Sequence, residues 1–407
     1  VREMNCRVIY VLSVCLALSG LSACIEEPMF EDGLVGEGES TVSFGAVFRP
    51  MEDATLGKTR SLGGNEIRDI NDMSVVMYRE DGSLASYYYF DKDELTVTDE
   101  PRPGYDESVT KNVAFQCKVP YGRYRIYAIA NMGNLTTDDR ILTEGEFKAL
   151  PLEWNHEDIA ANNQMSGYFS ESPSTAYASG EAPLLTIGKS DISLHAWLRR
   201  AVSKVTVAFR ADSLKDNIYI YIKSAQIKDI PLGCKLVDAN APDSAEELLH
   251  EGDTVQFGKG DEYQMWPALS CGRGANRYGN HDNDAPSLFF YENMQGKHPD
   301  KHKYGNFESK DNVPYGTYVE VKGYYINKTT ENPSYGNITY RCMLGKNMTD
   351  DFNAERNTHY KLTLVFRNDA NDPDWHIEYD YQPAPPEIIV PSPIYISYLA
   401  NQSVDIP

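Results

Sequence analysis

The sequence has little positive charge. Of its 407 residues, 38 are Lys or Arg and 60 are Asp or Glu, so the formal net charge is −22. Binding to a nucleic-acid backbone needs clustered cations, and binding to an anionic lipid surface needs a basic patch. Both classes of function are therefore disfavoured. Any attachment to a membrane would have to come from an inserted segment or a covalently bound lipid.

The sequence also lacks the motifs that mark common enzymes and cofactor sites. It contains no GxSxG elbow, HExxH pair, Walker phosphate loop or EF-hand spacing, and no two cysteines have CxxC spacing. We therefore expect no enzymatic activity, no cofactor and no metal site. Four cysteines are widely spaced along the body of the chain, where buried free thiols are the default and two disulfides remain compatible with the spacing. They are Cys117, Cys234, Cys271 and Cys342.

Long apolar runs are also missing. The stretch 8–18 follows Arg2 and Arg7, but it is too short to span a membrane and is typical of a signal peptide over 1–23. The residues Leu-Ser-Ala-Cys that end at Cys24 resemble the bacterial lipobox, which implies cleavage before Cys24 and its lipidation. The alternative is an ordinary signal with a coincidental cysteine. An acidic, Gly-containing tether follows over 24–39.

Short apolar or alternating runs, separated by Gly, Pro, Asn and Asp, predict an all-β body. In the first run, alternate residues share one face and should be buried together. They are Val42, Phe44, Ala46 and Phe48. Asp81-Gly82 predicts a hairpin, and Thr143 is a candidate N-cap for a short helix over 144–150. Further strands are expected over 112–119, 122–130, 191–198, 204–210, 218–227, 316–326, 338–344 and 359–367, whereas 271–286 is expected to be a surface loop.

Several motifs along this body resemble the fimbrillin superfamily. Their order along the chain is GRYRIYAIAN at 122–131, MSGY at 165–168, LRRAVSKV at 198–205, FYENMQG at 290–296, VEVKGYY at 319–325 and DFNAERNTHY at 351–360. The resemblance covers residues 40–382. It implies two tandem transthyretin-like Greek-key β-sandwich domains after a lipoprotein signal peptide. A thinning of strand formers over 172–188 places these domains at 40–180 and 190–382, followed by a Pro-rich linker and strand segment at 383–407.

The resemblance also implies processing. In fimbrillins a trypsin-like protease cuts after an arginine near the start of the chain and removes the first strand. Here the polar, Gly-rich stretch 56–64 favours a cut between Arg60 and Ser61, with Arg49 as the rival site. The alternative is that both arginines are merely solvated turn residues. Loss of the first strand would uncover unpaired backbone groups and an apolar groove that requires a replacement strand.

The C-terminal segment contains a candidate for that replacement. In shaft pilins of this family a terminal segment fills the groove of a neighbour; here the segment could equally pair within its own chain or begin a further module. The candidate donor residues are Ile388, Ile389, Val390, Ile394, Tyr395, Ile396, Tyr398 and Leu399.

The sequence therefore predicts a fimbrial structural, anchor or accessory subunit at the outer membrane and cell surface. Its partners would be other fimbrial subunits or copies of itself, with a lipid anchor in the outer membrane. The alternative is a monomeric surface lipoprotein that binds a glycan or a host protein. It is favoured by 28 Tyr and four Trp, because exposed aromatic rings suit binding surfaces. We expect Trp197 in the core and at least one exposed ring in the run 87–89.

Overall fold

The computed structural model describes most of the body of the chain. The described residues are 38–48, 70–100, 110–171, 181–188, 192–271, 276–281, 285–299, 313–330, 333–347 and 350–370, with the backbone alone of 47–48, 97–100, 110–112, 394–398 and 402–406. None of the helices in this part of the chain has the length and apolarity that a membrane crossing requires.

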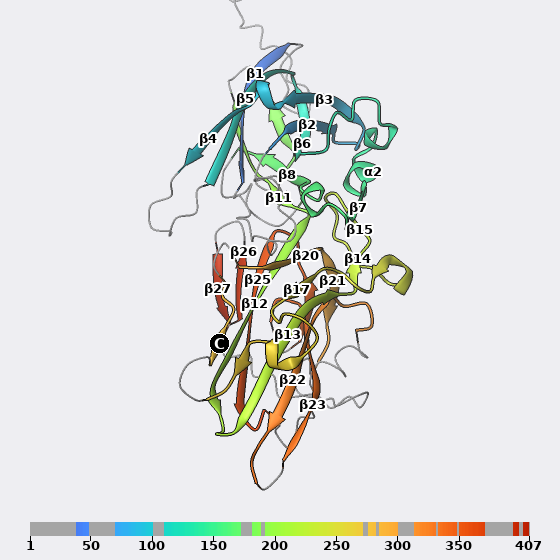
Figure 1. The fold of residues 1–407 in the computed structure, drawn as a ribbon. Coiled ribbons are helices and arrows are strands. Elements are labelled where there is room, and N and C mark those ends of the chain that lie inside the picture. Colours follow the sequence, from blue (N-terminus) through green and yellow to red (C-terminus); the bar gives the residue numbers. More distant parts are fainter. Residues whose placement is uncertain are drawn as a thin grey trace, which may run out of the picture.

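The N-terminal part is one strongly folded sheet in the order β3-β2-β6-β8-β10-β1-β5-β4, with β9 on β6 and β11 on β8 (Figure 1). Its strands are β1 (Glu39–Phe48), β2 (Asp72–Arg79), β3 (Leu84–Asp91), β4 (Thr96–Glu100), β5 (Thr110–Pro120), β6 (Gly122–Ala130), β8 (Met165–Ser170), β9 (Leu185–Ile187), β10 (Ile192–Trp197) and β11 (Arg199–Arg200). Apolar residues of β1, β2, β5, β6, β8 and β10 form one buried cluster. The two halves of the sheet therefore enclose a common core, as in a β-sandwich.

The C-terminal part packs two further sheets against each other (Figure 1). One has the order β19-β12-β25-β26-β27 with β20 on β12, and the other has the order β17-β13-β22-β23 with β18 on β13. The first contains β12 (Val202–Leu214), β19 (Arg277–Tyr278), β20 (Ser287–Tyr291), β25 (Thr358–Asn368), β26 (Ile394–Tyr398) and β27 (Gln402–Ile406). The second contains β13 (Ile218–Lys228), β17 (Thr254–Gln256), β18 (Ala268–Leu269), β22 (Tyr318–Asn327) and β23 (Ser334–Met343).

Short elements complete the fold. The two-stranded pairs join β14 (Ile230–Pro231) to β16 (Leu248–Leu249), β7 (Pro151–Glu153) to β15 (Gly233–Lys235), and β21 (Asn293–Lys297) to β24 (Asp351–Ala354). The helix α2 (Glu144–Lys148) begins after Thr143, whose side chain accepts a hydrogen bond from the Glu146 N–H at 3.3 Å. The single-turn 3₁₀ helices are η1 (Lys92–Glu94), η2 (Asp139–Ile141), η3 (Ile159–Ala161), η4 (Ala245–Glu247) and η5 (Tyr263–Met265).

The two parts are joined by a bridge built from both. Strand β7 of the N-terminal part pairs with β15 of the C-terminal part, and Ser166 donates a 2.7 Å hydrogen bond to the Leu236 carbonyl. Arg356 donates to the Leu236 carbonyl at 2.7 Å and forms a buried ion pair with Glu292 at 2.9 Å. The ion pair thus fixes residues 236–240, the strap that follows β15, to the C-terminal core. The same strap contacts the N-terminal part through the Leu236 carbonyl.

The predicted all-β class and the sandwich packing are confirmed. The hairpin at Asp81-Gly82 is confirmed as the β2–β3 turn, where Gly82 has φ +82°. The helix at Thr143 is confirmed but ends at Lys148 rather than 150. Trp197 is buried as predicted. The count of two domains remains a prediction.

Two details of the structure bear on the sequence prediction. Strand β10 lies in the N-terminal sheet, between β1 and β8, while the domain bounds 40–180 and 190–382 stay a prediction. The segment 271–286 is not only a loop, because Arg277 and Tyr278 form β19 beside β12. Strand β19 was missed because its partner β12 is distant in sequence.

Candidate functional site

The first strand of the body lies inside the N-terminal sheet rather than at its edge. Strand β1 pairs antiparallel with β5 along its whole length, from Glu39 opposite Pro120 to Phe48 opposite Lys111. Its other side pairs in parallel with β10, from Val42 opposite Ile192 to Val47 opposite Trp197. A parallel partner so distant in sequence requires a long connection, which the whole of β2 to β9 supplies. Strand β1 therefore lies between β10 and β5 and joins them into one sheet.

Alternation places one face of β1 in the core. Val42, Phe44 and Ala46 are buried, as predicted, and only the backbone of Phe48 is described. Ser43, between them, lies on the opposite face, where its hydroxyl accepts a 3.0 Å hydrogen bond from the Gln116 amide. The first strand thus contributes apolar side chains to the core on one side and ordinary surface contacts on the other.

Among the buried residues of β1, Phe44 contacts aromatic rings of two other strands. Its ring stacks on Phe115 of β5 with 5.2 Å between ring centroids and an interplanar angle of 9°. Phe169 of β8 meets it edge-on at 4.9 Å and 70°. Phe44 therefore joins both halves of the folded sheet, and both ring geometries are those that aromatic quadrupoles favour. Alternation within 112–119 could have indicated Phe115, but the partner on β8 could not be found from the sequence.

Tyr88 and Cys117 lie near the same strand. Tyr88 of β3 donates a 2.9 Å hydrogen bond to the Lys118 carbonyl of β5. Because β3 and β5 lie toward opposite ends of the strand order, this bond links the two halves of the folded sheet. Cys117, opposite Val42 in the register, has its pKa raised to about 12 by burial. The thiol stays protonated near neutral pH and is a poor nucleophile. Cys117, Cys234 and Cys271 are free thiols, and Cys234 and Cys342 are buried.

Several predicted site residues lie outside the described residues. They are Cys24, Arg49, Arg60, Ser61, Ile388, Ile389, Val390 and Leu399. The chain between Phe48 and Ile70, which carries both candidate cleavage sites, is part of this set. The processing of the chain therefore stays a prediction, while the structure gives the place of the strand that processing would remove.

The described part of the candidate donor segment forms β26. Ile394, Tyr395, Ile396 and Tyr398 belong to this strand, which pairs antiparallel with β25 of the same chain over Thr358 to Lys361. Strand β27 continues from β26 as a hairpin. The segment therefore has strand conformation and, in this single chain, pairs in cis.

Among the described residues, no group of three or more His, Cys, Asp or Glu side chains is arranged to hold a metal ion. The strands beside β1 place polar side chains opposite its outward positions, with Lys118 opposite Thr41 and His195 opposite Gly45. Strand β1 is held by the packing of its buried face and by backbone pairing with β5 and β10.

Comparisons with known proteins give the following likenesses. Residues 288–364 match a family described as a domain of unknown function, DUF4906. No protein in the curated set matches the chain. Among solved structures, the chain is similar to the tip fimbrial protein Mfa3 of Porphyromonas gingivalis with a C-terminal truncation, at 12% identity and a TM-score of 0.46, covering 81% of this chain and 95% of that one.

Two proteins of Parabacteroides distasonis are also similar. One is a candidate cell adhesion protein, at 14% identity and a TM-score of 0.47, with 80% of this chain and 88% of that one covered. The other is a fimbrial assembly protein, at 9% identity and a TM-score of 0.39, with 82% and 93% covered.

Proposed function

We propose that the protein is a structural or accessory subunit of a cell-surface fimbria, exported as a lipoprotein through Cys24 and assembled by exchange of β1. In this proposal a trypsin-like protease cuts between Arg60 and Ser61. The excised segment, with its lipid and β1, leaves, and a donor strand from another copy or another fimbrial subunit takes its place. Retention of the lipid would instead correspond to an anchor subunit with the same fold.

The observation that supports the proposal best is the position of β1. It has partners on both sides, so its loss exposes unpaired N–H and C=O groups along β5 and β10 together. The same loss vacates the core positions of Val42, Phe44 and Ala46. Exposing a buried Val or Phe side chain costs roughly 1.5–3 kcal/mol. A groove of this kind is unstable when empty and binds an extended apolar strand.

The second support is the connection that follows β1. Residues 49–69 separate it from Ile70, and they contain four basic residues, Arg49, Lys58, Arg60 and Arg68. A cut there removes the covalent link without touching a residue of β1 itself. Afterwards only non-covalent contacts hold β1 between β5 and β10. Cleavage therefore converts an internal strand into a ligand that another strand can displace.

The third support is the C-terminal segment. Ile394, Ile396 and Tyr398 occur at alternate positions, so an extended chain presents them on one face, as β1 presents Val42, Phe44 and Ala46. In cis this segment pairs with only four residues of β25. Donation in trans would require its release from β25, and the greater pairing length along β5 would compensate for the loss of these pairs.

The proposal is tested by limited trypsin digestion of a chain that begins after Cys24, followed by N-terminal sequencing and light scattering. We expect a new N-terminus at Ser61, followed by loss of the released segment and growth into oligomers. Trypsin also cuts after Lys58 and Arg68, so Arg60→Ala alone should abolish only the N-terminus at Ser61. Its combination with Lys58→Ala and Arg68→Ala should abolish release and oligomer growth as well, whereas Arg49→Ala should abolish neither. A chain cut after Arg60 that stays monomeric under conditions that release β1 would contradict the proposal.

A truncation after Tyr381 separates the roles of groove and donor. The truncated chain should be cut as before, and the cut chain should accept a donor from full-length protein but should form no chains with copies of itself. Unchanged assembly of the truncated protein alone would exclude the C-terminal segment as the donor strand.

A further inference from the structure

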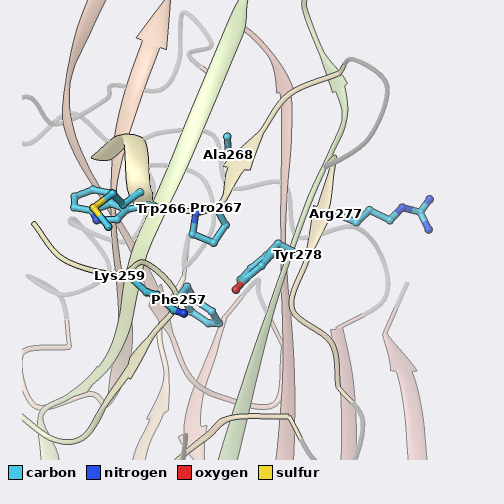
Figure 2. Close-up of a pocket in the computed structure, with 8 residues that line it drawn as sticks. Phe257, Lys259, Trp266, Pro267, Ala268, Arg277 and Tyr278 are labelled. Carbon is cyan, nitrogen blue, oxygen red and sulfur yellow. The ribbon is translucent and has the colours of Figure 1, made fainter. Parts of the chain in front are cut away.

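A pocket of about 380 Å³ opens on the C-terminal part, away from β1. It lies where the segment from β17 through η5 to β18 meets β19 (Figure 2). Its lining consists of Phe257, Lys259, Met265, Trp266, Pro267, Ala268, Arg277 and Tyr278. Its volume is at the lower end of the range of about 300–1,000 Å³ found for small-molecule sites. It therefore suits a ligand of one or two rings.

The aromatic walls of the pocket are held rigidly from behind. Phe257 meets Phe209 of the core edge-on at 5.2 Å and 90°. Trp266 is buried, and its indole N–H donates a 3.0 Å hydrogen bond to the Gly260 carbonyl. The Lys223 ammonium lies 5.2 Å from the centre of the same ring, a cation–π contact. These walls need no ordering when a ligand binds, which favours affinity.

Tyr278 forms the accessible wall. Its ring packs edge-on against Phe257 at 5.7 Å and 81°, yet 37% of the residue is exposed. Gly279, with φ +73°, brings the chain close to β12, since a Cβ there would lie 2.7 Å from the Val207 carbonyl oxygen. Figure 2 shows Phe257, Pro267 and Tyr278 converging on one space. The pocket thus exposes the ring and hydroxyl of Tyr278 above an apolar floor of Phe257 and Pro267.

The two charged residues that line the pocket, Lys259 and Arg277, are both cationic. Lys223 pairs with Asp261 at 3.3 Å, and Arg277 pairs with Asp212 at 3.4 Å. Figure 2 shows Arg277 pointing away from the pocket. Lys259 is exposed and is in none of the ion pairs found among the described residues. In a protein of net charge −22, this leaves an ammonium group at the rim of an aromatic pocket.

We propose that this pocket binds one pyranose ring of a glycan that carries an acidic substituent, a carboxylate or a sulfate. The apolar C–H face of the sugar would pack against Tyr278 and Phe257. Lys259 would pair with the acidic group, and the Tyr278 hydroxyl would bond a sugar hydroxyl. The pocket does not suit an added β-strand, because β19 has only two residues. This site is independent of β1, so it requires neither cleavage nor assembly.

The test is binding of free sugars to the uncut protein, measured by saturation-transfer NMR and calorimetry. The probes are glucuronic acid, N-acetylneuraminic acid and 6-sulfo-N-acetylglucosamine, with glucose and N-acetylglucosamine as neutral counterparts. We expect at least one acidic sugar to bind more tightly than the neutral ones, and its affinity to fall as salt rises because the pairing with Lys259 is exposed. The carboxylate and sulfate probes distinguish the two possible acidic groups.

Two variants locate the site. Tyr278→Ala should weaken binding of the acidic sugar on the order of tenfold, because it removes the accessible ring. Lys259→Met should weaken binding of the acidic sugar and leave the neutral sugars unchanged. The matched control is Tyr335→Ala, which removes a ring that is 74% exposed on β23 outside the pocket and should change nothing. Circular dichroism confirms that each variant is folded.

Three results would overturn the proposal. The first is that none of these sugars binds the uncut protein. The second is binding that neither Tyr278→Ala nor Lys259→Met weakens. The third is a concentration-dependent dimer that Tyr278→Ala dissociates, since the pocket would then be an interface between copies of the chain.

Discussion

Phe44→Ala tests whether β1 is integral to the core or lies loosely on it. Phe44 is 2% exposed and touches Phe115 on the neighbouring strand and Phe169 on the opposite half of the sheet. Truncation removes both ring contacts at once. The cavity is bounded by two other large rings in a sheet with partners on both sides, so the surroundings have little freedom to collapse into it.

The expected loss of stability follows from these contacts. Phe→Ala in a core costs about 3–5 kcal/mol, and a site that cannot collapse lies toward the upper end of that range. Phe44→Ala should therefore reduce the free energy of unfolding by about 4 kcal/mol. In a chain cut after Arg60, the same loss falls on the affinity of the excised strand, where about 4 kcal/mol is on the order of a thousandfold.

Urea denaturation followed by circular dichroism measures the first quantity, and the rate at which the cut segment is lost measures the second. The matched control is Ser43→Ala, one residue away on the exposed face, which should change the free energy of unfolding by no more than about 0.5 kcal/mol. A loss below about 1 kcal/mol for Phe44→Ala, or equal losses for both variants, would refute the packing argument for β1.

Three further predictions concern the rest of the fold. Glu292→Ala should lower the free energy of unfolding in urea by about 3–5 kcal/mol, because it leaves the buried Arg356 charge without its partner. Gly167→Ala should lower the free energy of unfolding by about 1–3 kcal/mol, since a Cβ would lie 2.2 Å from the Trp197 carbonyl oxygen. Gly145→Ala on the open face of α2 should raise the same free energy by about 0.5–1 kcal/mol, and equal effects of the two variants would contradict the β8 geometry. Burial favours the neutral thiol and raises the pKa of Cys234 in the folded protein to about 12, from about 9 in the unfolded chain. The stability contributed by the protonated Cys234 is therefore complete below pH about 9 and is lost as the pH rises toward 12. Over that window Cys234→Ala should lose stability less steeply than the wild type, by about 1.4 kcal/mol per pH unit in a denaturant series; parallel pH curves would contradict it.

The strands were predictable where one face is buried. Alternation at Val42, Phe44 and Ala46 indicated β1, and Asp81-Gly82 indicated the β2–β3 turn, because these signals depend on side chains two residues apart or on one turn. The same local signals cannot show which strands pair. Nothing near Ile192 indicates that β10 returns to lie beside β1.

The sites that depend on distant pairs were not predictable. Glu292 and Arg356 are 64 residues apart in sequence, and their pairing depends on the packing of the strap after β15. Phe257 and Tyr278 meet only because β19 folds onto β12, in a segment expected to be a loop. The candidate cleavage site and the lipidation site, by contrast, rest on sequence motifs alone, since both lie outside the described residues.

The most direct test of strand exchange is the N-terminus of the protein as it occurs on the cell surface. Intact mass and N-terminal sequencing of native surface material distinguish two states. We predict a chain that begins at Ser61, without lipid or covalently attached β1, in an oligomeric assembly. A chain that retains acylated Cys24 throughout this material would contradict exchange of β1 and would leave an anchor subunit or a monomeric surface protein.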